Sequence, residues 1–311
     1  MKRKFKTNSK FYAMYAAFMD KYEGLRHMTP VEPSFAGSGT RICYLPHHEV
    51  MKGEGEASKI RVVFNGSSRL PSGDSLNTLL LTGPNLLPTL PHVLLRWRRH
   101  RFVLVTDIEK MYRQVLVHKA DRDLQRVVWR SDRRDATQEY QLNMVTYGLT
   151  CAPFLAIRAL QQLASDEGER FPQGVRVLRQ DVYVNDVLTD TSTEGRSIRD
   201  QLIQLCMAGG FPLRKWATNA DELLEDIAPE HRQYCKHREW EPEQCHSTLE
   251  LQWHPRQEAF GYRVRLRQEE TVTKRVVLAE TARLFDPLGW IAPVVIRAKI
   301  LIQALWMQRI D

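Results

Sequence analysis

The chain has 311 residues, of which 43% are hydrophobic and 26% are charged. This is the composition of a globular protein with a substantial core, and it excludes a chain that is disordered throughout. The formal net charge of +8 and the pI of about 9.3 favour an anionic partner, but charge alone does not identify nucleic acid.

Targeting and redox signals are weak. The N-terminal residues MKRKFKTNSK are basic, but an amphipathic pattern follows them instead of an apolar signal region. The most apolar run, residues 291–307, is interrupted by charged residues and predicts no membrane span. The five cysteines include no CxxC pair, which favours reduced thiols in an intracellular protein. Cysteines and histidines gather in residues 235–246, but their spacing fits no zinc pattern and indicates incidental clustering.

The N-terminal third predicts a helix followed by a hairpin. Aromatic and methionine residues recur at helical spacing over 8–24, where Asn8 or Ser9 could cap the helix. Residues 41–46 and 59–66 read as two strands joined by the polar turn MKGEGEAS. Residues 66–91 are rich in Gly, Pro, Asn and Ser and predict an irregular connection.

The middle of the chain alternates helices and strands. Residues 91–101 predict a helix, and FVLVTDI (102–108) predicts a buried strand that ends on Asp107. Two further strands are expected at 126–130 and 139–145. A long helix should begin near Pro153.

The C-terminal half continues this mixed pattern. The expected elements are β structure over 175–190, a helix over 195–208 that ends at Gly209-Gly210, a strand over 211–218, a helix over 220–228, a hairpin over 248–266 and two helices in the last 40 residues. Antiparallel strands with helices on one side indicate an α+β fold.

Two acidic residues could meet across a sheet. Asp107 ends a strand, and Asp186 lies at a hairpin turn within DVYVNDVLTD (181–190). Converging carboxylates at such a place would bind Mg²⁺, which prefers oxygen ligands. The alternative is that Asp107 caps a turn and Asp186 shapes a hairpin. Spacing alone favours that alternative.

An ordered set of motifs changes this interpretation. DIEKMYRQV (107–115), TYGLTCAPF (146–154), YVNDVLTDT (183–191) and GGFPLRKW (209–216) follow the order of the palm motifs of a reverse transcriptase, and KIRVVFNGSSR (59–69) precedes them as a fingers motif. Over roughly residues 40–307 the chain resembles the polymerase of BEL/Pao-type LTR retrotransposons, a likeness to which YLPHH (44–48), SLNTLLLTGPNLLP (75–88) and ARLFDPLGWIAPVVIRAKILIQ (282–303) also contribute.

The resemblance implies a right-hand polymerase fold in which helices back an antiparallel palm sheet. Residues 1–40 would form an N-terminal helix and loop, 41–218 the fingers and palm, and 219–311 a thumb- or connection-like region. The implied activity is RNA-directed DNA synthesis, in which a primer 3′-OH attacks the α-phosphate of a deoxynucleotide with the help of two Mg²⁺ ions. Template–primer nucleic acid and deoxynucleoside triphosphates would be the partners. The implied location is the cytoplasm, in a virus-like particle if the element is intact.

The resemblance also implies roles for individual residues. Asp107 and Asp186 resemble the metal-binding aspartates, and Ile108 would turn its backbone toward the nucleotide phosphates. Tyr112 resembles the steric gate against a ribose 2′-OH; its alternative role is that of a half-buried core tyrosine. The remaining candidates are Lys59 and Arg61 for the triphosphate, Gly148 for close backbone approach to template and nucleotide, Lys215 as a general acid or a surface lysine, and Arg263 and Arg265 for nucleic acid.

The chain departs from the family pattern where the chemistry lies. Asn185 stands where the first aspartate of the YxDD hairpin belongs, and an amide brings no negative charge. Strand alternation would also turn Asp186 to the opposite face. Asn65 in the fingers motif and Glu250 in LELQW are further departures. With no protease, ribonuclease H or integrase recognised, we expect a remnant with impaired synthesis, and the alternative is a catalytically dead protein that only binds template–primer.

Overall fold

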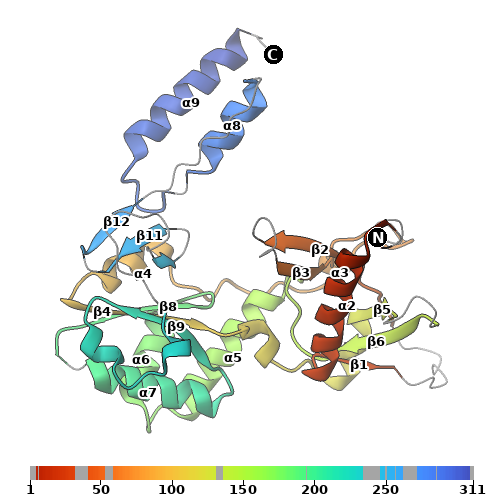
Figure 1. Cartoon of the computed structure of the whole chain (residues 1–311), viewed down its shortest axis with the longest axis horizontal. Coiled ribbons are helices and arrows are strands. Elements are labelled where there is room, and N and C mark those ends of the chain that lie inside the picture. The colour runs from red at the N-terminus through yellow and green to blue at the C-terminus, as the bar shows by residue number, and fades with distance from the viewer. Residues whose placement is uncertain are drawn as a thin grey trace. The chain divides into compact units, whose positions relative to one another are not determined.

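The structure is a computed structural model that describes residues 5, 7–31, 41–52, 59–130, 136–193, 195–233, 246–248, 251–255, 257–261, 272–284 and 286–308. The chain divides into two compact units (Figure 1). Unit 1 comprises residues 1–86, 110–163 and 209–211, and unit 2 comprises residues 87–109, 164–208 and 212–311. The expectation of a mixed α+β fold with antiparallel sheets is confirmed in both units.

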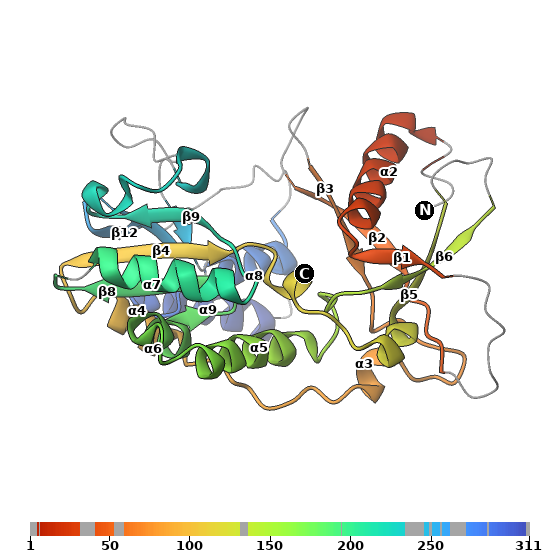
Figure 2. The ribbon, with the colours of Figure 1, turned by 90° about the horizontal axis from the view of Figure 1, so that it is seen from below.

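Unit 1 is built around one long helix, a three-stranded sheet and a hairpin. Its elements are α2 (Ser9–Gly24), β1 (Met28–Pro30), β2 (His47–Lys52), β3 (Lys59–Phe64), α3 (Leu76–Leu79), the 3-10 helices η2 (Met111–Gln114) and η3 (Lys119–Gln125), β5 (Arg126–Trp129) and β6 (Gln138–Leu142). The sheet has the order β1-β6-β5, and β2 and β3 pair separately. Figure 2 shows α2 lying beside this hairpin.

Helix α2 follows directly from the sequence pattern. The side chain of Asn8 accepts a hydrogen bond from the Phe11 N–H at 2.9 Å, which satisfies one of the unpaired donors of the first turn. Tyr15, Met19 and Tyr22, spaced three and four residues apart, are buried in the core of unit 1. Both the predicted helix and one of its predicted caps are confirmed.

The expectation of a strand over 41–46 is wrong. This segment forms only an isolated bridge from Tyr44 to Arg126, and the partner of β3 is β2, six residues further on. The sequence HHEVMK of β2 is largely polar because the hairpin lies at the surface, whereas Cys43 and Leu45 of the preceding segment are buried without strand pairing. The predicted turn between the strands lies outside the described residues.

Unit 2 contains a four-stranded antiparallel sheet of order β7-β8-β4-β9. The strands are β4 (Phe102–Ile108), β7 (Val182–Tyr183), β8 (Asp186–Thr191) and β9 (Leu213–Thr218). Helix α4 (Leu90–Trp97) contacts β7 and β8, and helices α6 (Pro172–Gln180) and α7 (Gly195–Ala208) lie on the other face (Figure 1). Helix α5 (Ala152–Asp166), most of which belongs to unit 1, precedes α6.

The central strand β4 is the best-predicted element of the chain. Its bounds agree with the predicted 102–108, and its residues Val103, Leu104 and Val105 are buried because the sheet is covered on both faces. On one face, Val103 and Val105 pack with Trp97 of α4 and with Trp253. A buried central strand therefore carries Asp107 to its position.

Several expectations for unit 2 are corrected. Residues 175–180 belong to helix α6 and not to a strand, because Pro172 starts a helix whose residues Gly174, Val177 and Leu178 are buried. The helix expected over 220–228 is only the short 3-10 helix η4 (Asp221–Leu224), and a second one, η5 (Pro229–His231), follows it. The helix expected over 91–101 ends at Trp97.

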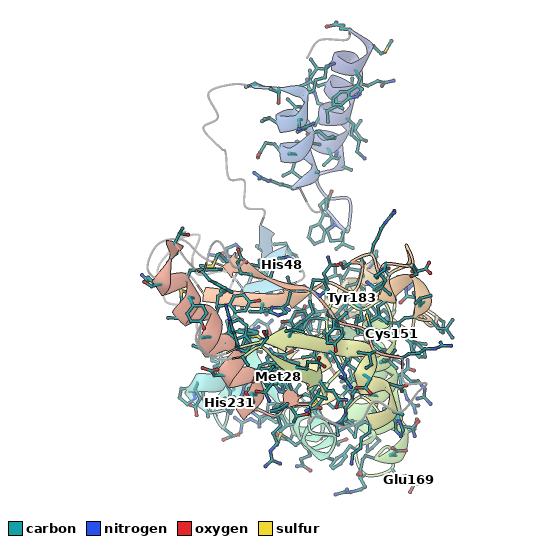
Figure 3. All side chains as sticks on the ribbon, turned by 90° about the vertical axis from the view of Figure 1, so that its right-hand side faces the viewer. Met28, His48, Cys151, Glu169, Tyr183 and His231 are labelled. Carbon is teal, nitrogen blue, oxygen red and sulfur yellow. The ribbon has the colours of Figure 1, made fainter. Side chains whose placement is uncertain are left out.

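The C-terminal part contains a small sheet and two helices. The predicted hairpin is a three-stranded sheet of β10 (His246–Thr248), β11 (Leu251–His254) and β12 (Ala259–Gly261). The two helices predicted in the last 40 residues are α8 (Lys274–Ala282) and α9 (Ala292–Met307), and they pair with each other. Figure 3 draws the side chains of both helices. Val294, Ile300 and Leu301 of α9 are exposed. Among the described residues, no helix combines the length and apolarity needed to cross a membrane.

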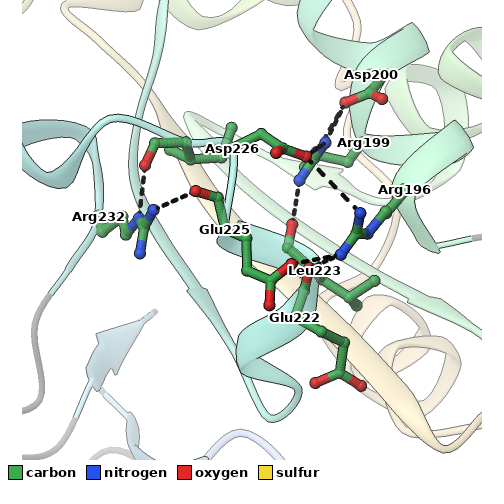
Figure 4. A network of polar contacts seen from close by, with 9 residues as sticks. Arg196, Arg199, Asp200, Glu222, Leu223, Glu225, Asp226 and Arg232 are labelled. Atoms are coloured by element: carbon green, nitrogen blue, oxygen red, sulfur yellow. Dashed lines mark hydrogen bonds and ion pairs between the residues drawn. The ribbon is translucent and has the colours of Figure 1, made fainter.

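A buried arginine fastens α7 to η4 (Figure 4). The side chain of Arg199 is 3% exposed and forms ion pairs with Asp200 at 2.7 Å and with Asp226 at 3.4 Å. It also donates to the carbonyl of Leu223. Arg196, one turn earlier and half exposed, pairs with Glu225 at 2.7 Å. This network places the chain after β9 against the helical layer.

Candidate functional site

The two candidate aspartates lie directly opposite each other. Asp107 of β4 is the cross-strand partner of Asp186 of β8. Directly opposed residues of an antiparallel pair share one face of the sheet, where their β-carbons are about 5 Å apart. Asp107 is nearly buried, with a side chain that is 15% exposed. The sheet therefore brings together the two carboxylates that the sequence singled out.

The turn between β7 and β8 consists of Val184 and Asn185, and Tyr183 (labelled in Figure 3) pairs with Asp186 across it. Val184 has φ = 57°, a left-handed conformation that is unfavourable for a β-branched residue. Strain of this kind costs about 1–3 kcal/mol and gathers at functional sites. The backbone of the turn is therefore a structural sign of function that the sequence did not provide.

Asn185 is hydrogen-bonded to the carboxylate of Asp107. Its Nδ2 donates to Asp107 Oδ2 at 2.5 Å, and its carbonyl accepts the N–H of Ile108 at 2.8 Å. The expectation that alternation turns Asp186 away from the site is wrong, because Asn185 lies in the turn and outside the pleat while Asp186 is in register with Asp107. The N–H of Ile108 is engaged by this turn, and its side chain is buried.

The electrostatics of Asp186 reflect this arrangement. Burial and the neighbouring Asp107 carboxylate raise the pKa of Asp186 from 3.8 to about 6, and the nearby Lys215 opposes the rise. Both causes disfavour the charged form of a carboxyl group. Below about pH 6, Asp186 therefore holds a proton and the pair carries less than two full negative charges.

Lys215 reaches this pair through an irregularity of strand β9. The register changes between the pairs Val105–Ala217 and Asp107–Arg214, so that three steps along β9 oppose two along β4. Lys215 lies in this bulge with φ = 58°, and its Nζ is 3.3 Å from Asp107 Oδ2. Bulges often redirect a side chain next to a functional site.

The site is poorly equipped for a pair of divalent ions. Its charged groups are two carboxylates and one ammonium, and Asn185 points hydrogen atoms at the carboxylate oxygen that a cation would need. In the part of the chain that the structure describes, no three His, Cys, Asp or Glu residues form a metal-binding group. The two-ion Mg²⁺ centre that the resemblance implies does not fit this donor set.

Apart from Ile108, the candidate nucleotide residues belong to unit 1. Lys59 and Arg61 both lie on β3. The Arg61 guanidinium lies over the Tyr147 ring, 4.7 Å from its centre, and the Tyr147 hydroxyl donates to the carbonyl of Val62. Tyr147, which sequence reasoning missed although it adjoins Gly148, therefore positions Arg61.

Gly148 has a strict steric reason for being glycine. Its φ is 96°, and a β-carbon would lie 2.5 Å from the carbonyl oxygen of Phe64. Asn77, a second residue that was missed, donates to the Gly148 carbonyl at 2.9 Å and accepts the N–H of Thr150 at 3.0 Å. The close contact at Gly148 is with the end of β3, and its approach to template and nucleotide stays a prediction.

Tyr112 lies in η2 and is partly buried against the core of unit 1. Burial raises the pKa of its hydroxyl. This environment suits a core tyrosine, and the steric-gate role stays a prediction.

The remaining candidates, Arg263 and Arg265, lie outside the described residues, as does Glu250. Residues 94–101, LLRWRRHR, carry four arginines. Two of these form ion pairs within unit 2: Arg96 with Asp181 at 3.2 Å and Arg98 with Glu258 at 3.1 Å.

Similarities to other proteins are partial. Residues 273–311 match the family described as Pao retrotransposon-like RNaseH-like domain. No curated protein is significantly similar to the chain. A foamy viral protease-reverse transcriptase (dRH) in complex with double-stranded DNA is 16% identical, with a TM-score of 0.46 over 63% of this chain and 29% of that one. The selenomethionine-labelled CSH mutant of the Prototype Foamy Virus protease-reverse transcriptase is 13% identical, with a TM-score of 0.49 over 66% of this chain and 24% of that one. The chain thus spans less than a third of either protein.

Proposed function

We propose that this chain is the reverse-transcriptase-like part of a BEL/Pao-type LTR retrotransposon polyprotein, a nucleotidyltransferase by descent. The observation that carries the proposal is the Asp107–Asp186 pair at the end of a buried strand, next to a strained hairpin turn. The order of the sequence motifs and the family match over residues 273–311 support it.

The proposed roles of the two regions of the chain follow the order of the motifs. Residues 41–218 would provide fingers and palm, and residues 219–311 a thumb- or connection-like region. The ligands would be an RNA or DNA template–primer and deoxynucleoside triphosphates, and the proposed setting is intracellular. Arg61 and Lys59 are the candidate contacts to the triphosphate, since an arginine fork suits phosphate oxygens.

We further propose that DNA synthesis by this chain is strongly impaired. Replacing a carboxylate by the Asn185 amide removes one negative charge. At about 4 Å from a unit positive charge and an effective dielectric of about 20, that charge is worth roughly 4 kcal/mol. A barrier raised by this amount slows a reaction by about a thousandfold. Binding of the template–primer does not need that charge, so a chain that binds nucleic acid without extending it is the second candidate function.

The test is primer extension on an RNA template by the full chain and by Asn185→Asp. We expect extension by the variant to exceed that of the unaltered chain by at least a hundredfold, and Asp107→Asn in the variant background should abolish the gain. Equal extension by both proteins would show that Asn185 is not the limiting residue. Affinity for template–primer that falls steeply with salt, with no extension by any variant, would favour the binding-only function.

A further inference from the structure

Lys215 occupies its position at a structural cost. In a regular ladder Arg214, which opposes Asp107, would share its face and Lys215 would point to the other side. The bulge and the positive φ of Lys215 reverse this, although a left-handed residue costs roughly 1–2 kcal/mol. Arg214 instead pairs with Glu109 at 3.0 Å. The strand is thus distorted in a way that brings an ammonium to Asp107.

One oxygen of Asp107 accepts a hydrogen bond from Asn185 and forms an ion pair with Lys215. Asn185 Nδ2 lies 2.5 Å and Lys215 Nζ 3.3 Å from Asp107 Oδ2. An aspartate at position 185 could not donate a hydrogen bond there while ionised. The amide and the ammonium together therefore satisfy the carboxylate that a metal ion would otherwise satisfy.

We propose that Lys215 is the resident cation of this site, held against Asp107 together with Asn185, and that a divalent ion can bind only by displacing it. The inference rests on the proposed function, because it is in a polymerase-like site that these carboxylates would meet metal ions. The lysine makes the net charge of the site −1. Once the lysine is displaced, the two carboxylates can share one ion, and Mg²⁺ commonly binds through one or two carboxylates.

The first test measures Mn²⁺ binding to the full chain without nucleic acid, from the electron paramagnetic resonance signal of free Mn²⁺. Lys215→Gln should bind one Mn²⁺ at least tenfold more tightly than the unaltered chain. Lys215→Arg, which keeps the charge, should not. Arg214→Gln is the matched control, since it removes a neighbouring cation that pairs with Glu109 instead. No gain in Lys215→Gln, or an equal gain in Arg214→Gln, would overturn the proposal.

A second measurement uses the unaltered chain and so does not depend on how a variant folds. Lys215 is 62% exposed and open to acetylation. Saturating Mn²⁺ should raise the rate at which acetic anhydride labels Lys215, measured by mass spectrometry, by several-fold over its rate in EDTA. A labelling rate that does not respond to Mn²⁺ would contradict displacement.

Failure of this inference is distinct from failure of the proposed function. If Asn185→Asp extends primers but Lys215→Gln gains no Mn²⁺, the resident-cation inference is wrong and the polymerase assignment stands. If Lys215→Gln gains Mn²⁺ but no variant extends a primer or binds template–primer, the assignment is wrong, and the site is only a carboxylate pair neutralised by a lysine.

Discussion

Replacing Asp186 by asparagine should stabilise the protein in a pH-dependent way. The pKa of Asp186 is raised from 3.8 to about 6, chiefly by burial and secondly by Asp107. Between these two values the native state holds a proton that the unfolded chain has lost, so the free energy of unfolding falls as pH rises from about 4 to about 6. At about 1.4 kcal/mol for each pKa unit, the full loss is about 3 kcal/mol, and the partial exposure of the side chain reduces it to about 2 kcal/mol.

The assay compares thermal unfolding of the unaltered chain and Asp186→Asn at pH 4 and pH 7.5. The variant should melt several degrees higher at pH 7.5 and at nearly the same temperature at pH 4. Asp107→Asn supplies a second check: it should lower the Asp186 midpoint, followed by carboxyl NMR, but not to its ordinary value, because burial is the larger cause. A stability difference that is the same at both pH values would refute this reasoning.

Two further predictions concern the scaffold of each unit. Gly148→Ala should destabilise the protein by about 1–3 kcal/mol more than Gly73→Ala, measured as a larger drop in melting temperature. Both glycines have positive φ, but only at Gly148 would a β-carbon lie against a carbonyl oxygen. Arg199→Ala should cost about 1–3 kcal/mol in urea unfolding because it leaves the carbonyl of the buried Leu223 without this donor, whereas the exposed Arg196→Ala should cost less than about 1 kcal/mol. Equal costs within either pair would contradict the corresponding argument.

The parts of the fold that the sequence predicted are those that local patterns determine. Strand β4 has β-branched residues in a continuous apolar run, and α7 has helical spacing followed by two glycines, so both were placed correctly. The errors came from segments whose pattern is ambiguous. Residues 175–180 alternate like a strand, yet the fold makes them a helix because Pro172 starts one whose buried face packs on α7.

The candidate site divides in the same way. Asp107, Asn185 and Asp186 could be selected from motifs because the residue types themselves carry the signal. The partners Tyr147 and Asn77 could not, since a ring under a guanidinium and an amide between two loops depend on contacts between distant segments. The position of Lys215 could not be predicted from the sequence either, because neither the bulge nor a left-handed lysine has a local sequence signature.

The amide at position 185 has two effects that reinforce each other. It removes a charge that would attract a cation, and it donates a hydrogen bond that holds Asp107 without one. A carboxylate in the same turn would instead add a third negative group beside Asp107 and Asp186. Repulsion by Asp107 already contributes to the raised pKa of Asp186. The turn with asparagine is therefore stable without a metal ion, and Lys215 offsets part of the negative charge of the carboxylates. The same contacts that stabilise this hairpin oppose the chemistry that its position in the sheet suggests.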